Sequence, residues 1–289
     1  MLTFSQAIVL GVLQGVTELV PVSSLGHSVI LPQLLGWTDV VAAQSAAESY
    51  FLALLVGLHV ATAVALLIFY RSTWVKIVRA LLESLRSRRI ETPEQRLGWL
   101  LVLATIPAGI VGLLLEHTLR VVFARPLAAA AFLIVNGLIL LAGELVRRHA
   151  AAGKSTTVPS GYRRLDRLEF REAGVIGVVQ VFALLPGISR SGITMVAGLA
   201  RGLDHEDAAR FSFLLATPII LAAGLYKLPD LIGPNGDGVR LQILVGSIAA
   251  GIAAYLSVRF LTRYFTTRTL IPFAVYSLVA GGLALIRFA

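Results

Sequence analysis

Long apolar segments separated by short polar stretches run along the whole chain. Six of them are uninterrupted and about 20 residues long, roughly over 50–70, 97–116, 126–147, 206–228, 239–260 and 268–288. About 20 apolar residues in a helix are enough to cross a hydrocarbon core of about 30 Å. The pattern therefore predicts six transmembrane helices.

Two further apolar regions, about 4–35 and 172–201, are interrupted near the middle. The interruptions read Pro21-Val-Ser-Ser-Leu-Gly26 and Pro186-Gly-Ile-Ser-Arg-Ser-Gly192. The halves on either side are about 12 to 16 residues, too short to span comfortably. We expect each region to form a re-entrant helix pair, whose broken backbone is buried in protein or lines a wet cavity.

The order of these elements repeats. A broken pair followed by three spans occurs over about 1–150 and again over about 170–289, and the polar stretch 149–170 is interpreted as a loop between the copies. With three crossings per copy, the second must be inverted relative to the first. The predicted fold is all-α: one integral membrane domain over 1–289, built by inverted repeat from six transmembrane helices and two re-entrant helix pairs.

Composition supports a membrane protein. Of the 289 residues, 57% are hydrophobic and 14% charged, with a mean hydropathy of +0.83, whereas soluble domains are about 25% charged. The first residues lack the basic region and cleavage site of a signal peptide and are interpreted as mature protein. The absence of cysteine excludes disulfides, thiolate metal sites and a cysteine nucleophile.

The net charge of +9 reflects membrane topology and predicts no nucleic-acid partner, because the basic residues flank the apolar segments. Most of the 25 lysines and arginines lie in 71–96, 147–171, 201–210 and 259–268. These segments should be cytoplasmic, so that both termini lie outside a cytoplasmic (inner) membrane crossed several times. The tips of the two broken pairs would then enter from opposite sides and meet near the midplane.

The first broken segment places Gln14 and Glu18 four residues apart, on one helix face. Their oxygens suit a hard divalent cation such as Mg²⁺ or Ca²⁺. A carboxyl group at this depth is costly, and intramembrane ionisable residues usually have a function. The alternative is a protonated Glu18 that is hydrogen-bonded within the bundle.

A new helix should begin after Pro21, capped by Ser23 or Ser24. Its free amide groups and positive dipole end suit a phosphate. His27 follows Ser24 by three residues, and a hydroxyl near an imidazole is a candidate nucleophile and base. Taken alone, His27 would be interpreted as a packed core residue.

The second broken segment contributes Arg190, the only lysine or arginine in the hydrophobic interior of either broken segment. An arginine there needs an anion, and its forked donors match phosphate oxygens. Ser189 is expected to cap the following helix, and Thr194 shares a face with Arg190. The alternative is a structural ion pair between Arg190 and Glu18.

Other polar residues are interpreted as structural. His59, Glu48 and Asn136 are expected in packing or interfaces, and Asp204-His-Glu-Asp207 as a helix cap before the span at 206. The chain contains no P-loop, dinucleotide fingerprint or His-Glu-x-x-His pattern.

Together the motifs resemble one family, the bacterial undecaprenyl-diphosphate phosphatases, also called bacitracin-resistance phosphatases. That family is marked by Glu/Gln-x-x-x-Glu, then Pro-Val-Ser-Ser-x-Gly-His, then Pro-Gly-x-Ser-Arg-Ser-Gly. The chain has Gln14 and Glu18, then Pro21-Val-Ser-Ser-Leu-Gly-His27, then Pro186-Gly-Ile-Ser-Arg-Ser-Gly192, in the same order. The resemblance covers essentially the whole chain.

The resemblance implies hydrolysis of undecaprenyl diphosphate to the monophosphate carrier, aided by a divalent cation at a site open to the outer face. Gln14 and Glu18 would hold the metal, and Arg190 would bind phosphate. Ser24 and His27 would be nucleophile and base, with a metal-activated water as the alternative nucleophile. The substrate oxygens would be oriented by three further residues, Ser23, Ser189 and Thr194.

A polyprenyl-phosphate lipid transporter or flippase is the alternative from another functional class. Inverted repeats with broken midplane helices are typical of transporters. The site residues favour hydrolysis, because a carrier needs no nucleophile. The sequence leaves the oligomeric state open, with a homodimer among the alternatives.

Overall fold

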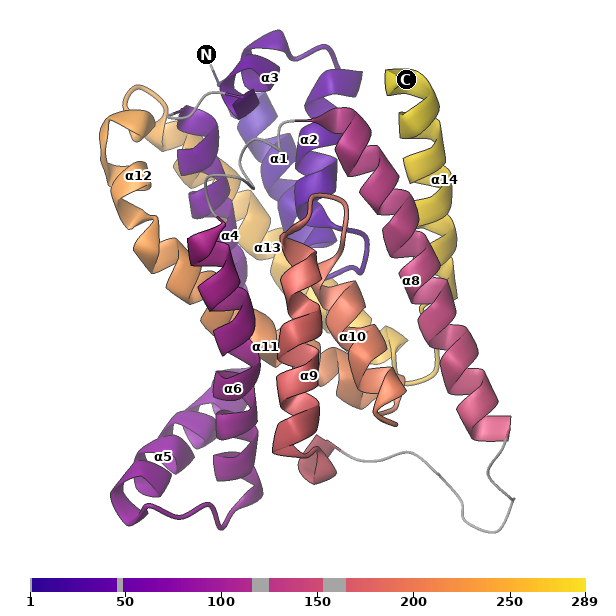
Figure 1. The fold of residues 1–289 in the computed structure, drawn as a ribbon. Coiled ribbons are helices and arrows are strands. Elements are labelled where there is room, and N and C mark those ends of the chain that lie inside the picture. The colour runs from indigo at the N-terminus through magenta and orange to yellow at the C-terminus, as the bar shows by residue number, and fades with distance from the viewer. Residues whose placement is uncertain (1, 46–48, 116–124, 153–164) are drawn as a thin grey trace.

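The computed structural model describes residues 2–45, 49–115, 125–152 and 165–289. Helices make up almost all of this part of the chain (Figure 1). They are α1 (Phe4–Thr17), α2 (Ser24–Leu34), α3 (Thr38–Ser45), α4 (Tyr50–Phe69), α5 (Arg71–Ser87), α6 (Pro93–Leu114), α8 (Pro126–Ala152), α9 (Phe170–Gln180), α10 (Arg190–Ala200), α11 (His205–Tyr226), α12 (Leu228–Ile232), α13 (Arg240–Tyr264) and α14 (Ile271–Phe288). The described 3₁₀ turns are η1 (Leu165–Arg167), η2 (Val181–Leu184) and η3 (Pro234–Gly236).

The six predicted spans are confirmed. Among the described residues, six helices are long and apolar enough to cross a membrane: α4, α6, α8, α11, α13 and α14. Their ends differ from the predicted ends by a few residues, since polar caps extend helices beyond the apolar run. At the start of α6, for example, Thr92 and Gln95 form a capping box ahead of the apolar residues.

The two broken regions form helix pairs, as predicted. In the first, α1 ends at Thr17, and Pro21, which has no N–H to donate, lies in the turn before α2. In the second, α9 passes into η2, and Leu185 takes the extended conformation favoured before a proline. The α1–α2 pair lies in the half of the molecule that contains both termini, and the α9–α10 pair lies in the other half (Figure 1).

The tips of the two pairs meet in the middle of the protein. The Gly187 N–H donates to Ser23 Oγ over 3.1 Å. Gly187 has a φ of +104°, and a Cβ there would lie 2.4 Å from Ala129 O on α8. Glycine is therefore required both for the conformation and for the close approach.

A buried side chain from α8 joins the tips. Asn136 Nδ2 donates to Pro21 O over 3.0 Å and to Ser277 Oγ over 3.2 Å. Asn136 Oδ1 accepts the N–H of Ser189 over 2.9 Å. The sequence interpretation of Asn136 as a structural residue agrees with this position, which fixes one broken segment against the other.

The first broken pair is also packed tightly against the second repeat. Helix α1 packs along α13, and a Cβ on Gly11 would lie 2.1 Å from Gly246 O. Small residues at helix interfaces in membranes let backbones approach closely, which replaces the missing hydrophobic driving force. This close contact fixes the position of α1 against α13.

A polar cluster ties the opposite end of the bundle together. Glu144 on α8 accepts hydrogen bonds from the Leu270 N–H, over 2.8 Å, and from His205, and its second oxygen pairs with Arg147 over 3.3 Å. The stretch beginning at Asp204 does cap α11, since its carboxylate accepts the Asp207 N–H. The capping stretch therefore also anchors α11 to α8.

Both ends of the chain lie on one face, together with α3 and α12, while α5 lies at the opposite end (Figure 1). Helix α5 is amphipathic, with Ile77 and Ala80 buried and its basic residues exposed. Among the described residues, the termini and the basic helix α5 thus lie at opposite ends of the molecule, as the prediction requires.

Candidate functional site

A cavity of about 390 Å³ starts where the two tips meet. From α4 it is lined by residues of the first three turns, and from α11 by residues of the last three turns up to Lys227. Both sets lie toward the face that holds the termini (Figure 1). The volume is within the range of pockets that hold small ligands, and the lining extends from the two tips toward that face.

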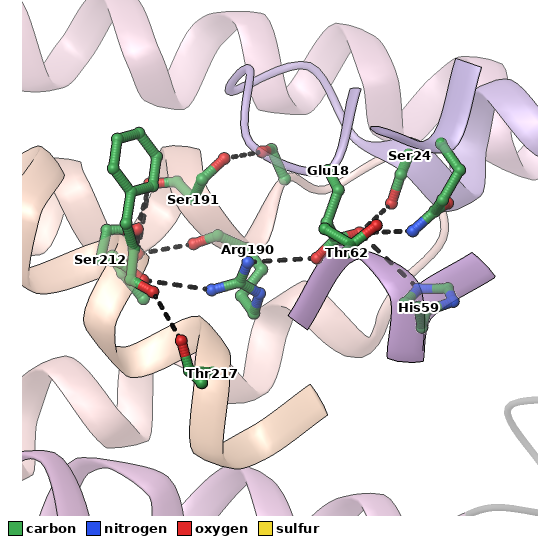
Figure 2. A network of polar contacts seen from close by, with 12 residues as sticks. Glu18, Ser24, His59, Thr62, Arg190, Ser191, Ser212 and Thr217 are labelled. Atoms are coloured by element: carbon green, nitrogen blue, oxygen red, sulfur yellow. Dashed lines mark hydrogen bonds and ion pairs between the residues drawn. The ribbon is translucent and has the colours of Figure 1, made fainter. Parts of the chain in front are cut away.

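Glu18 is the centre of the polar end of the cavity (Figure 2). Its Oε2 accepts the Ser24 hydroxyl over 2.5 Å and Gln14 Nε2 over 3.1 Å. Its Oε1 accepts Arg190 Nη2 over 3.1 Å. The two broken segments, 172 residues apart along the chain at this pair, thus share one ion pair at their tips.

Arg190 is held from behind by α11. Its Nη1 donates to Ser212 O over 3.3 Å, and its Nε, which is buried, has no hydrogen-bond partner among the described residues. The side chain is 13% exposed and lines the cavity. A donor left over at this depth suits an anionic ligand, because a buried polar group without a partner costs free energy.

Ser23 caps α2, whereas Ser24 contacts Glu18. Ser23, with a φ of +70°, is the N-cap of α2, and its Oγ accepts the N–H of Gly26 over 3.3 Å and that of Gly187. Ser24 is the first residue of α2, so its hydroxyl is not needed for the cap and turns to Glu18. Both serines line the cavity.

His27 points away from Ser24. Its Nδ1 contacts Ser23 O at 2.7 Å and its Nε2 contacts the hydroxyl of Tyr276 on α14 at 2.8 Å, with the two rings stacked. His27 is not among the residues that line the cavity. The predicted pairing of Ser24 with His27 is therefore replaced in the structure by a pairing of Ser24 with Glu18. The spacing of three residues predicts that Ser24 and His27 lie near each other on α2. In the structure, however, the His27 ring points toward Tyr276 on α14.

The two other predicted phosphate-binding residues differ in position. Ser189 lines the cavity and caps α10 by accepting the Gly192 N–H over 3.2 Å. Thr194 lies behind Arg190, 1% exposed, and contacts Ser212 Oγ at 2.7 Å. In this position Thr194 supports α10 and does not face the cavity.

Gln14 shares a face with Glu18, as predicted, but presents its NH₂ group to the carboxylate. Its Oε1 is fully buried and has no hydrogen-bond partner among the described residues. An orphaned carbonyl oxygen beside a carboxylate is an arrangement that a hard cation would satisfy. Within the described ranges, however, no group of three or more His, Asp and Glu side chains could hold a metal ion alone.

His59 was interpreted from the sequence as a packing residue, and this interpretation is corrected by its position. Its Nε2 lies 3.6 Å from Glu18 Oε2, and the side chain is 30% exposed in the cavity (Figure 2). The rule that an ionisable residue in a span is functional would have identified it. Ser212, whose carbonyl supports Arg190, carried no sequence signal, and Glu48 lies outside the described residues.

Known proteins similar to this chain match it along nearly its whole length. The family model described as bacitracin resistance protein BacA matches residues 7–283. The chain is 56% identical over 338 aligned positions to undecaprenyl-diphosphatase 2 of Frankia alni, covering 100% of this chain and 98% of that protein. It is 55% identical over 299 positions, with the same coverage, to the undecaprenyl-diphosphatase of Mycolicibacterium paratuberculosis. To undecaprenyl-diphosphatase 2 of Chromobacterium violaceum it is 44% identical over 285 positions, covering 97% of each chain.

Proposed function

We propose that this chain, which belongs to the bacitracin resistance protein BacA family, hydrolyses undecaprenyl diphosphate to undecaprenyl phosphate and inorganic phosphate. The reaction regenerates the lipid carrier of cell-wall synthesis and would confer bacitracin resistance, as the family's description states. The observation that carries the proposal is the contact of Ser24 with Glu18 beside Arg190, in a cavity between the tips of two broken helices.

The geometry supports a two-step reaction through Ser24. Its Oγ attacks the terminal phosphorus, an Oγ–P bond forms, and the bond to the lipid phosphate breaks, so that undecaprenyl phosphate leaves with the bonding electrons. Glu18 takes the serine proton, because its Oε2 already accepts that hydroxyl. Water then attacks the phosphoserine and the Oγ–P bond breaks. Glu18 returns its proton to Oγ, and inorganic phosphate leaves with both protons of the water.

Arg190 and the start of α2 stabilise the charge that develops. The guanidinium lies against Glu18 and lines the cavity end, and preorganised donors of this kind lower the transition-state energy. The first amides of α2 add the positive end of a helix dipole. The cavity is too small for a whole undecaprenyl chain, so most of the tail would lie in the bilayer.

Gln14 and Glu18 would hold a divalent cation together with oxygens of the substrate. Protein sites for Mg²⁺ commonly supply one or two oxygens and leave the rest to water and substrate phosphates. The orphaned Gln14 Oε1 and the Glu18 carboxylate provide such a pair. The bound cation would neutralise charge on the diphosphate oxygens.

Phosphate release from undecaprenyl diphosphate by the purified protein in detergent tests the proposal. We expect release with Mg²⁺ or Ca²⁺, loss of activity in excess chelator, and recovery when the cation is restored. Gln14→Glu is expected to stay active and to bind the cation more tightly, since it adds a carboxylate beside Glu18. Full activity in excess chelator would remove the metal from the mechanism. No phosphate release with either cation would refute hydrolysis and favour the transporter alternative.

The site is proposed to open to the outer face of the cytoplasmic membrane. The cavity lining extends toward the face that holds the termini, and the basic segments lie at the other end. The excess of basic residues favours a cytoplasmic location for that end.

Single cysteines in this cysteine-free chain test the orientation. Ser87→Cys at the end of α5 and Asp237→Cys after η3 are both at exposed positions on opposite faces. In intact cells we expect an impermeant thiol reagent to label Asp237→Cys and to leave Ser87→Cys unlabelled until the membrane is broken. The reverse pattern would show that the orientation is wrong.

A further inference from the structure

Helix α5 lies at the end of the molecule opposite the termini and contacts two of the spans (Figure 1). Only Tyr70 separates its first residue from the end of the span α4. Near the other end of α5, Ser84 Oγ accepts the indole N–H of Trp99, in the second turn of the span α6, over 3.0 Å. A Cβ on Gly98 would lie 2.6 Å from Leu81 Cγ, so α5 packs closely on the start of α6. Both ends of α5 are therefore adjacent to ends of spans, which places this helix along the membrane surface.

One side of α5 is apolar and exposed, although another side already packs on the protein. The packed side contains Ile77, Ala80 and Ser84, which are buried. The exposed apolar residues follow one another at intervals of three, four and three positions, which places them on a single helix face. This apolar stripe consists of Val75, Val78, Leu82 and Leu85, which are 59, 50, 62 and 58% exposed. An exposed apolar row of this kind marks a surface that contacts lipid or another protein.

A charged face borders the apolar stripe. Arg79 and Arg86 are seven residues apart, about two turns, so they lie on the same side of the helix. Both line a surface groove of about 660 Å³ together with three residues of the stripe. Glu83 lines it as well, so the groove contains two cationic side chains and one anionic side chain. Over the whole of α5, four basic residues stand against one acidic residue. An apolar face beside a basic face is typical of helices that lie in a membrane interface.

We propose that α5 is an in-plane helix that binds anionic phospholipids of the bilayer. The apolar stripe contacts the acyl chains, and Arg79 and Arg86 bind phosphate groups of the lipid headgroups, whose oxygens match the forked donors of arginine. Anionic lipid is favoured over a second copy of this chain, because two copies that met along the stripe would bring their own arginines together. In the proposed orientation these lipids belong to the cytoplasmic leaflet, whose surface is negative. This surface lies outside the cavity and does not depend on hydrolysis.

Trp74, which is half-buried and lines the groove beside the stripe, serves as the probe of lipid contact. In nanodiscs that hold one protomer, its fluorescence is measured with brominated phosphatidylglycerol and with brominated phosphatidylcholine, because bromine on an acyl chain quenches an indole ring that it touches. The difference between the wild type and Trp74→Phe isolates the signal of Trp74 from the other two tryptophans. We expect both lipids to quench Trp74 and the anionic lipid to be preferred. Added salt should reduce this preference.

Two pairs of arginines provide matched variants. In Arg79→Gln/Arg86→Gln the preference for the anionic lipid should fall by about fivefold or more, the contribution of about one basic residue near an anionic surface. Arg79→Lys/Arg86→Lys keeps the charge and should retain most of the preference. Arg88→Gln/Arg89→Gln removes the same charge at exposed positions just after α5 and should stay within about twofold of the wild type.

Three results would overturn the inference. Trp74 that neither lipid quenches would show that α5 lies outside the interface. Equal quenching by both lipids, or an equal loss of preference in the Arg88 and Arg89 variant, would show that Arg79 and Arg86 bind no headgroup. Leu82→Cys, the one cysteine in that variant, tests the remaining occupant: a disulfide between two copies in lipid vesicles would assign the stripe to a second copy of the chain. Phosphate release enters none of these measurements, so this inference and the proposed function can fail separately.

Discussion

Replacing Glu18 by glutamine is expected to lower phosphate release from undecaprenyl diphosphate by about a thousandfold or more, because the amide cannot take the proton of Ser24. General bases contribute about a hundred- to ten-thousandfold to enzymatic rates. Glutamine keeps the shape of the side chain and can still accept the Ser24 hydroxyl, which lies 2.5 Å from Oε2. The loss therefore measures proton transfer together with the negative charge that lies beside Arg190 and would also bind the cation.

Two comparisons make this prediction specific to the proposed mechanism. Ser24→Ala should lose about as much activity as Glu18→Gln, and the double variant should be no worse, because residues that act as one unit are not additive. His27→Gln should lose much less, since the His27 ring contacts Tyr276 outside the cavity. Near wild-type release by Ser24→Ala would exclude the serine as nucleophile and favour a water molecule. A loss in His27→Gln equal to that in Glu18→Gln would return the histidine to the role of base.

Arg190→Lys is expected to lower the rate by about a hundred- to a thousandfold, the usual cost of removing one preorganised donor. Lysine keeps the charge but loses the planar fork. In the structure that fork reaches Glu18 with one nitrogen and Ser212 O with another, while the buried third nitrogen, Nε, has no hydrogen-bond partner among the described residues. A single ammonium group cannot serve all three positions. The measurement is the rate at saturating lipid, with melting temperature in detergent recorded beside it.

Folding and catalysis must be separated here, because Arg190→Ala would leave the buried Glu18 carboxylate without its cation. Breaking a buried pair in this way costs about 3–5 kcal/mol of stability, so Arg190→Lys is the primary variant. Ser212→Ala keeps the carbonyl that contacts Arg190 and should lose less than about tenfold, as should Thr194→Val, whose hydroxyl faces away from the cavity. An active Arg190→Lys protein would show that the arginine serves mainly to join the repeats. A large loss of activity in Thr194→Val would instead support the prediction from the sequence that Thr194 contacts the substrate.

The helical architecture and the two segments that form the candidate site could be predicted from the amino-acid pattern alone. Six apolar runs near 20 residues and two regions broken at Pro21 and Pro186 predict the helices that the structure contains. This works because lipid offers no hydrogen-bond partners, so that an apolar segment of sufficient length must be a helix. The cost of ionisable groups at that depth likewise identified Glu18 and Arg190, which the structure brings to 3.1 Å.

Which of these groups face one another depends on how the helices pack in three dimensions. Spacing along a helix placed His27 near Ser24, yet the ring packs on Tyr276, 249 residues away, while Glu18 receives the serine hydroxyl across the turn. His59 on α4 and Lys227 at the end of α11 also line the cavity, although neither lies in one of the two broken segments that carry the family motifs. Helical periodicity fixes only the direction of a side chain from its own axis. What that side chain meets depends on the neighbouring helix, and that neighbour is set by long-range packing of small residues such as Gly11 on Gly246, which no local pattern records.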